Sequence, residues 1–172
     1  MNGEQFLLDL PSDQRADTFF AAVGRATALG SVFESGCKAL ASLLEVREQV
    51  PFESSEALVK LAMAAFARRL QRNISFLSSR LTTSSNVAQI LDDAREARNS
   101  VAHESTLGFS HFLDQPEALS ARLAELYQHA RRIAEGIRFI DYFLAVATHE
   151  PVPTARVLLD YPDYLAGWAC KS

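Results

Sequence analysis

Apolar residues recur every three or four positions along most of this chain, which is the spacing of one face of an α-helix, and no strand-like alternation stands out. A first helix is predicted from a cap at Ser12 or Asp13 to about residue 48. Gly24, Gly30 and Gly36 lie inside it, and each costs about 1 kcal/mol relative to Ala. These glycines either break the helix near Gly36 or let another helix approach it closely.

Two further helices are predicted in the middle of the chain. The second starts near Ser54 or Ser55 and continues as one helix, with an apolar stripe at Val59, Met63, Phe66, Leu70, Ile74, Leu77 and Leu81. The third follows a turn in which Asn86 and Gln89 resemble a capping box, and its apolar stripe is Val87, Ile90, Leu91, Ala94, Ala97 and Val101.

A fourth helix is predicted at Pro116, because Asp114 and Glu117 flank that proline as a start signal. Its apolar stripe is Leu119, Leu123, Leu126, Ala130, Ile133, Ile137, Ile140 and Leu144. The prolines of "HEPVP" end it, and the stretch "TARVLLDYPDYLAGWA" is expected to form a short helix that packs on the others. The expected fold class is all-α, an antiparallel bundle of four to five helices. It forms one domain over residues 1–172, with a core at about 14–148 and a C-terminal packing segment at 149–172.

The composition fits a folded domain, with 172 residues, 48% hydrophobic residues and a net charge of −4. No signal peptide and no run of about 18 apolar residues is visible, so we expect a cytoplasmic protein without a membrane partner. The two cysteines make no disulfide framework. His111, His129 and His149 share no metal-ligand spacing with His103, so no metal or other cofactor is expected.

The third predicted helix ends in "RNSVAH", which begins at Arg98 and ends at His103. Arg98 lies about 40° from Ala94 on the helical wheel, at the edge of the apolar face, so it needs a carboxylate, a phosphate or solvent. His103 points about 140° away from Arg98 and continues a ridge with Arg95 and Asn99. One straight helix therefore cannot aim both ends of the motif at the same atom. Either the helix unwinds near its end, or it meets a second copy and two chains line one cleft.

This hexapeptide is similar to the R-x4-6-H signature of the HEPN superfamily, in the form with a polar residue directly after the arginine. The resemblance implies an all-α, RNA-binding dimer, in many members a metal-independent endoribonuclease of a toxin or defence system. It implies His103 as general acid or base at the ribose 2′-OH or the leaving oxygen. It implies Arg98 as the group that binds the scissile phosphate and stabilises the transition state, with Asn99 orienting either group. Glu104, an acid that is common after such motifs, either polarises His103 or repels a phosphate.

The same resemblance bears on partners. A homodimer would bring Arg98 and His103 of two chains around a two-fold axis, and small residues on the first helix would let the chains approach, such as Gly24, Ala28 and Ser31. An antitoxin or another operon partner is a further expectation. The branch that is neutralised by a nucleotidyltransferase has a tyrosine two residues after the histidine, and Ser105 stands there instead, which argues against that branch.

Other interpretations of the motif stay open. Arg98 can pair with a core-edge carboxylate such as Asp141 or Glu45, and His103 can be a helix C-terminal residue favoured by the helix dipole. Many members of the superfamily keep the fold without catalysis. The alternative function is therefore a non-catalytic binding or adaptor module in a regulatory or defence system.

A second candidate surface precedes the motif, because residues 57–91 contain five basic residues and no acidic one. Phe76 lies among these arginines off the apolar stripe, where it can stack a base while guanidinium groups hold phosphates. Alternatively, this flank packs on another helix or on a dimer mate. The RNA-binding candidates are Arg69, Arg72, Phe76, Arg80 and Arg95.

Overall fold

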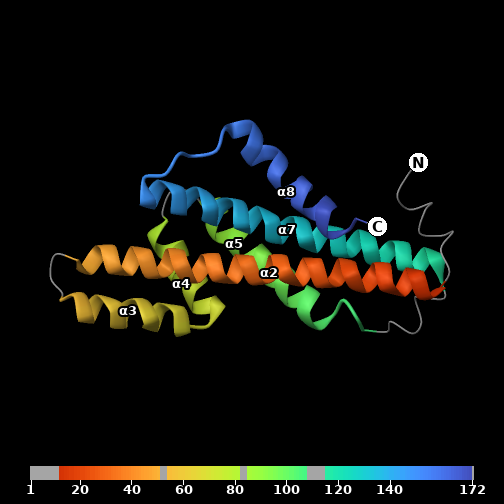
Figure 1. Cartoon of the computed structure of the whole chain (residues 1–172), viewed down its shortest axis with the longest axis horizontal. Coiled ribbons are helices and arrows are strands. Elements are labelled where there is room, and N and C mark those ends of the chain that lie inside the picture. The colour runs from red at the N-terminus through yellow and green to blue at the C-terminus, as the bar shows by residue number, and fades with distance from the viewer. Residues whose placement is uncertain (1–11, 51–53, 82–84, 108–114, 172) are drawn as a thin grey trace.

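The computed structural model describes residues 12–50, 54–81, 85–107 and 115–171 (Figure 1). Within these ranges the secondary structure is helical and contains no strand, which confirms the all-α fold class. The helices are α2 (Ser12–Gln49), α3 (Ser55–Ala67), α4 (Leu70–Arg80), α5 (Ser85–His103), α7 (Pro116–Thr148) and α8 (Ala155–Ala169). None of the described helices is both long and apolar enough to span a bilayer.

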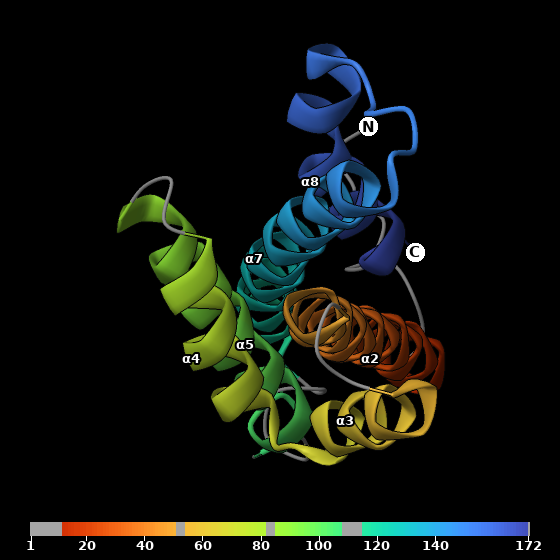
Figure 2. The same ribbon diagram turned by 90° about the vertical axis from the view of Figure 1, so that its left-hand side faces the viewer.

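The long helices α2 and α7 lie side by side in the middle of the bundle (Figures 1 and 2). Figure 2 shows α4 and α5 on one side of this pair, α8 beyond α7, and α3 beneath α2. One cluster of buried apolar side chains joins five of these helices, with large members such as Phe33, Leu91 and Ile133, and the described residues of α3 add none to it. The core is therefore formed by α2, α4, α5, α7 and α8.

The predicted second helix is two helices, and this is the main correction to the expected fold. Arg68 and Arg69 have extended backbones, with ψ of 149° and 144°, between the end of α3 and the start of α4. Neither Gly nor Pro stands at this break, so no local signal marks it. Asn73, which is fully buried, donates its amide to the Ala65 carbonyl at 3.3 Å and so ties the two helices together across the break.

The break changes the direction of everything that follows. Helix α4 crosses the bundle, so α5 runs opposite to α2, and α7 then runs in the same direction as α2 (Figure 1). The expectation of an antiparallel bundle is therefore wrong for the central α2–α7 pair.

The break between α3 and α4 also changes which residues of the predicted stripe are buried. Leu70, Ile74 and Leu77 on α4 pack in or against the core as predicted, whereas the α3 part of the predicted stripe is largely exposed, namely Val59, Met63 and Phe66.

The glycines of α2 do not break it, since the helix is continuous through Gly36. Two of them confirm the close-approach interpretation. A Cβ on Gly30 would lie 2.8 Å from Cγ of Arg98, and a Cβ on Gly36 would lie 2.8 Å from Cγ2 of Ile140. Gly24, in contrast, has nothing within 4 Å of that position. The bare backbone of α2 therefore lets α5 and α7 pack against it at Gly30 and Gly36.

The remaining helix ends agree in part with the sequence signals. Helix α5 begins at Ser85, so Asn86 lies inside its first turn and not before it, and the predicted capping box is wrong. Helix α7 begins at Pro116 as predicted, while Asp114 lies outside the described residues. Helix α8 confirms the predicted closing helix. Its C-terminal end is held by Arg25 of α2, which donates to the carbonyls of Ala169, at 2.9 Å, and Lys171.

Candidate functional site

The motif lies at the C-terminal end of α5, and the helix stays intact to His103. After it, the N–H groups of Glu104 and Ser105 donate to the Ser100 carbonyl at 2.8 and 3.2 Å, so the chain leaves the helix in a hydrogen-bonded turn. Arg98 and His103 point about 140° apart on a helical wheel, and one predicted way to bring them together is that the helix unwinds before His103. Because the helix is intact to His103, that prediction is wrong. Within one protomer, Arg98 faces α2 and His103 is exposed to solvent.

Arg98 is held by two side chains. Its Nη2 donates to Oε2 of Glu34 on α2 at 2.8 Å, and its Nη1 donates to Oδ1 of the neighbouring Asn99 at 3.2 Å. The start of its side chain lies on the bare backbone of Gly30. With 32% of the side chain exposed, the guanidinium is fixed but still accessible from solvent.

Glu34 was not among the predicted partners, and it bridges two cations. Its other oxygen, Oε1, lies 2.8 Å from Nζ of Lys38, one turn further along α2. The hydrogen bond from Lys38, helped by the positive charges of Lys38 and Arg98, lowers the pKa of Glu34 against the effect of burial. The carboxylate therefore stays ionised and anchors Arg98. The two suggested partners are wrong, since Glu45 pairs with Arg68 on α4's side of the bundle. Asp141 makes no ion pair with Arg98, and burial raises its pKa.

The ridge predicted on α5 is only partly open. Arg95 is engaged on its own helix, by Asp92 at 2.8 Å and Glu96 at 3.3 Å, and only 20% of its side chain is exposed. The carboxylates raise the pKa of Arg95 further, mainly through the Asp92 hydrogen bond. Asn99 is half-buried and is committed to Arg98, whereas His103 is exposed. Among Arg95, Arg98, Asn99 and His103, the groups that face solvent and are not fully engaged are therefore His103 and part of Arg98.

Glu104 belongs to a cluster that sequence reasoning missed. With Ser100, Arg122 and His129 it lines a cavity of about 10 Å³ between the α5 end and α7, which is room for one water molecule. Nε2 of His129 lies 3.9 Å from Glu125, and its buried Nδ1 has no hydrogen-bond partner among the described residues. Burial lowers the pKa of His129, against the opposing charges of Glu125 and Glu104. The one available sequence signal was the i, i+4 spacing of Glu125 and His129 on the flank of the α7 stripe.

The basic stretch around Phe76 has no acidic residue of its own, but in the folded chain carboxylates of α2 lie beside its arginines. Phe76 is half-buried against the core, and the guanidinium groups of Arg68 and Arg80 lie 5.7 and 5.5 Å from its ring centre. Glu45 and Glu48 of α2 neutralise these arginines, the latter at 3.1 Å from Arg80. The interpretation that Phe76 packs between helices is confirmed. The stacking surface proposed for a base is occupied by the protein's own arginines.

Two of the RNA-binding candidates are exposed without an ion pair among the described residues, whereas Arg80 is exposed but pairs with Glu48. Arg69 and Arg72 are exposed at the start of α4, and neither forms an ion pair with another described residue. A groove of about 630 Å³ lies between α2, α3 and α4, and neither of these two arginines lines it. Its lining mixes both charges with apolar groups: Glu45, Glu48, Gln49, Ala57, Lys60, Leu61, Phe76 and Arg80. Because two carboxylates, Glu45 and Glu48, lie among its two cations, Lys60 and Arg80, the groove itself is not a basic path for a phosphate backbone.

In the part of the chain that the structure describes, no three His, Cys, Asp or Glu residues lie close enough together to hold a metal ion. No family model matches the chain, and searches of curated proteins and of solved structures find no similar one. The chemistry of the site must therefore be inferred from its own residues.

Proposed function

We propose that this chain is a HEPN-like RNA-binding protein that cleaves RNA without a metal ion, with Arg98, Asn99 and His103 as its site. The observation that carries the proposal is the state of Arg98. Its guanidinium is partly exposed, fixed by Glu34 and Asn99, and has N–H groups left over after those two bonds. Such a fixed, accessible guanidinium suits a phosphate oxygen, because little reorganisation is needed when charge develops there.

In the proposed reaction, His103 removes the proton of a ribose 2′-OH, and that oxygen forms a bond to the adjacent phosphorus. The bond from phosphorus to the 5′-oxygen breaks, and the leaving oxygen takes a proton from a second imidazolium. Arg98 holds the non-bridging oxygens, and the products are a 2′,3′-cyclic phosphate and a 5′-hydroxyl. The second imidazolium is His103 of another copy, because each chain has one motif histidine. A second copy also lets Arg98 of one chain face His103 of the other, although the two point about 140° apart on one helix. Gly24, Ala28 and Ser31 leave an open, small-residue surface on α2 that suits such an approach.

The experiment is an RNA cleavage assay in EDTA with analysis of the new ends. Wild-type protein is expected to leave cyclic phosphates, and Arg98→Lys or His103→Gln should each lower the rate about 100-fold or more. Arg98→Lys keeps a positive charge near Glu34, so it separates loss of the guanidinium from loss of the fold. His149→Gln, at the exposed end of α7, is the matched control and should cleave like wild type. Loss of cleavage in EDTA, or full activity in His103→Gln, would contradict the mechanism.

A second candidate function is a binding module without catalysis. Two observations favour it. The ion pair with Glu34 and the packing on Gly30 already give Arg98 a structural role. In addition, the side chains of Arg69 and Arg72 are exposed and available to bind phosphates. In that case RNA is bound but never cleaved. Joint replacement of Arg69 and Arg72 by Glu should weaken binding in fluorescence anisotropy and reduce its salt dependence, whereas His103→Gln should leave both unchanged.

A further inference from the structure

Helix α3 has two apolar faces, of which the bundle covers one. The covered face lies against α2 and consists of half-buried or buried residues, namely Leu58, Leu61 and Ala65. The opposite face carries Val59, Met63 and Phe66, which are 59%, 68% and 51% exposed. A surface helix normally has a polar outer face, and a helix that is apolar on both sides is normally covered on both. The outer face of α3 therefore has the composition of a contact surface.

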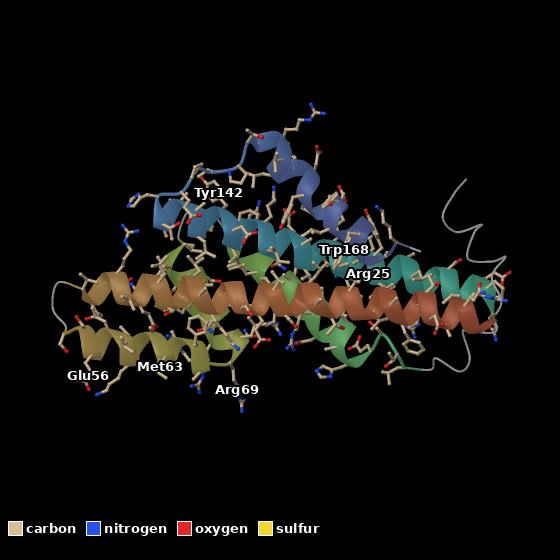
Figure 3. The ribbon with its side chains drawn as sticks, in the orientation of Figure 1. Arg25, Glu56, Met63, Arg69, Tyr142 and Trp168 are labelled. Carbon is tan, nitrogen blue, oxygen red and sulfur yellow. The ribbon has the colours of Figure 1, made fainter. Side chains whose placement is uncertain are left out.

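The charged residues at the ends of this face have opposite signs. In chain order the outer stripe reads Glu56, Val59, Met63, Phe66 and Arg69, and Figure 3 shows that Glu56, Met63 and Arg69 point away from the other helices along one edge of the molecule. Glu56 bonds to Lys60 through Oε1 at 2.7 Å, so its other oxygen can accept a further donor. Arg69 forms no ion pair with a described residue.

We propose that the outer stripe binds the outer stripe of a second copy of this chain, in antiparallel orientation, with a two-fold axis at Met63. The positions of Glu56 and Arg69 on either side of Met63 favour the antiparallel orientation. By the rise of an α-helix, Glu56 lies roughly 10 Å to one side of Met63. Arg69, just past the end of α3, lies on the other side (Figure 3), so the axis sets Glu56 of one copy beside Arg69 of the other. It also sets Val59 against Phe66. A parallel pairing would instead place Glu56 on Glu56, which opposes association.

Other occupants fit this surface less well. A polyanion such as RNA would meet Glu56 and three apolar side chains. A membrane-bound helix needs a strongly basic polar face, and Lys60 with Glu56 beside it supplies no net charge. The contact is independent of the proposed ribonuclease site, because the outer stripe contains none of Arg98, Asn99 and His103. One helix pair buries less than the usual 1,200–2,000 Å² of a stable complex, so the dissociation constant should be about 10–100 µM.

The test is sedimentation velocity without RNA, over about 5–500 µM protein. Wild-type chain should self-associate through the outer stripe over this range, and Met63→Glu should lose this step because it places two carboxylates at the axis. Any association through the α2 surface of the proposed ribonuclease is common to both proteins, so the difference between them reports the outer stripe alone. Val157→Glu, at a position on α8 that is 54% exposed, is the matched control and should dimerise like wild type. Both positions are solvent-exposed, and an unchanged melting temperature shows that each variant keeps the fold.

Charge reversal tests the orientation. Glu56→Arg and Arg69→Glu should each weaken the dimer about 3- to 10-fold, and the double variant should restore the wild-type dissociation constant. Three results would each overturn the proposal: a wild-type monomer across the whole range, a Met63→Glu dimer as tight as wild type, or a double charge reversal that is no tighter than either single one.

Discussion

The contact between Gly30 and Arg98 predicts that the same substitution will have opposite effects at two positions of α2. Gly24→Ala adds a methyl group where nothing lies within 4 Å, and Gly30→Ala adds one 2.8 Å from Cγ of Arg98. Carbon atoms do not approach this closely, so Arg98 or the α2–α5 spacing must shift. Because Cγ is close to the backbone of Arg98, its displacement moves the rest of the side chain. We therefore expect the guanidinium to lose at least one of its hydrogen bonds to Glu34 and Asn99.

The magnitudes can be compared directly because the two glycines share one helix. Replacing Gly by Ala inside a helix stabilises by about 0.5–1 kcal/mol, and this gain applies at both positions. At Gly30 it is opposed by an overpacking cost of about 1–3 kcal/mol. We therefore expect Gly24→Ala to raise the free energy of unfolding by about 0.5–1 kcal/mol. The free energy of unfolding of the Gly30→Ala variant should be about 1–3 kcal/mol lower than that of the Gly24→Ala variant.

Urea denaturation of both variants measures this difference. For a chain of this size, 1 kcal/mol corresponds to about 2–4 °C in melting temperature, so thermal scans also resolve it. In an Arg98→Ala background the obstacle is gone, and Gly30→Ala should become as stabilising as Gly24→Ala, which gives a coupling energy of about 1–3 kcal/mol. Equal stabilisation by both alanines in the wild-type background would refute the packing of Arg98 on Gly30.

Three further predictions follow from ionisable groups. The folded pKa of Glu34 lies below 4.5, so its stabilising effect is present above that pH and is lost as pH falls through the folded pKa, and Glu34→Gln should flatten the acid limb in urea titrations over about pH 3–6. The folded pKa of His129 lies below 6.5, so the unfolded chain binds its proton more readily and stability falls as pH drops below 6.5; His129→Gln should remove this loss, and an unchanged profile would contradict its burial. Burial raises the pKa of Cys37 to about 12 and of Cys170 to about 11, so neither should react quickly with a thiol reagent at about pH 8 until urea unfolds the chain.

Sequence patterns located the long helices because their signals are local. The apolar spacing of α2 and α7, with Pro116 at the start of one and the prolines after Thr148 at its end, depends only on neighbours in the chain. The break at Arg68 and Arg69 has no such signal. A single wheel drawn through it keeps Met63 and Ile74 in one stripe, but two extended residues rotate the second half relative to the first. Only α4 then presents its stripe to the core.

The sequence predicted the directions in which Arg98 and His103 point, but it did not predict which carboxylate pairs with Arg98. Turning 100° per residue places Arg98 toward the bundle and His103 away from it, and both positions are found. Glu34 lies 64 positions earlier in the chain, so no spacing rule relates it to Arg98. The same holds for Glu45 and Glu48, which neutralise the arginines around Phe76 although the stretch that contains Phe76 has no acid of its own.

Helix α2 contacts α3, α4, α5, α7 and α8, and this has a consequence for the chain as it leaves the ribosome. Its apolar face is made first, but Ile140, which packs on Gly36, is synthesised about one hundred residues later. At about 5–20 residues per second, the part of that face that α7 covers stays open for roughly 5–20 s. Over this interval α2 can pair with α3, α4 and α5 as they emerge, but it cannot bury Phe33 against α7. Nascent chains stalled before α7 should therefore bind holdase chaperones, and chains stalled after α8 should release them.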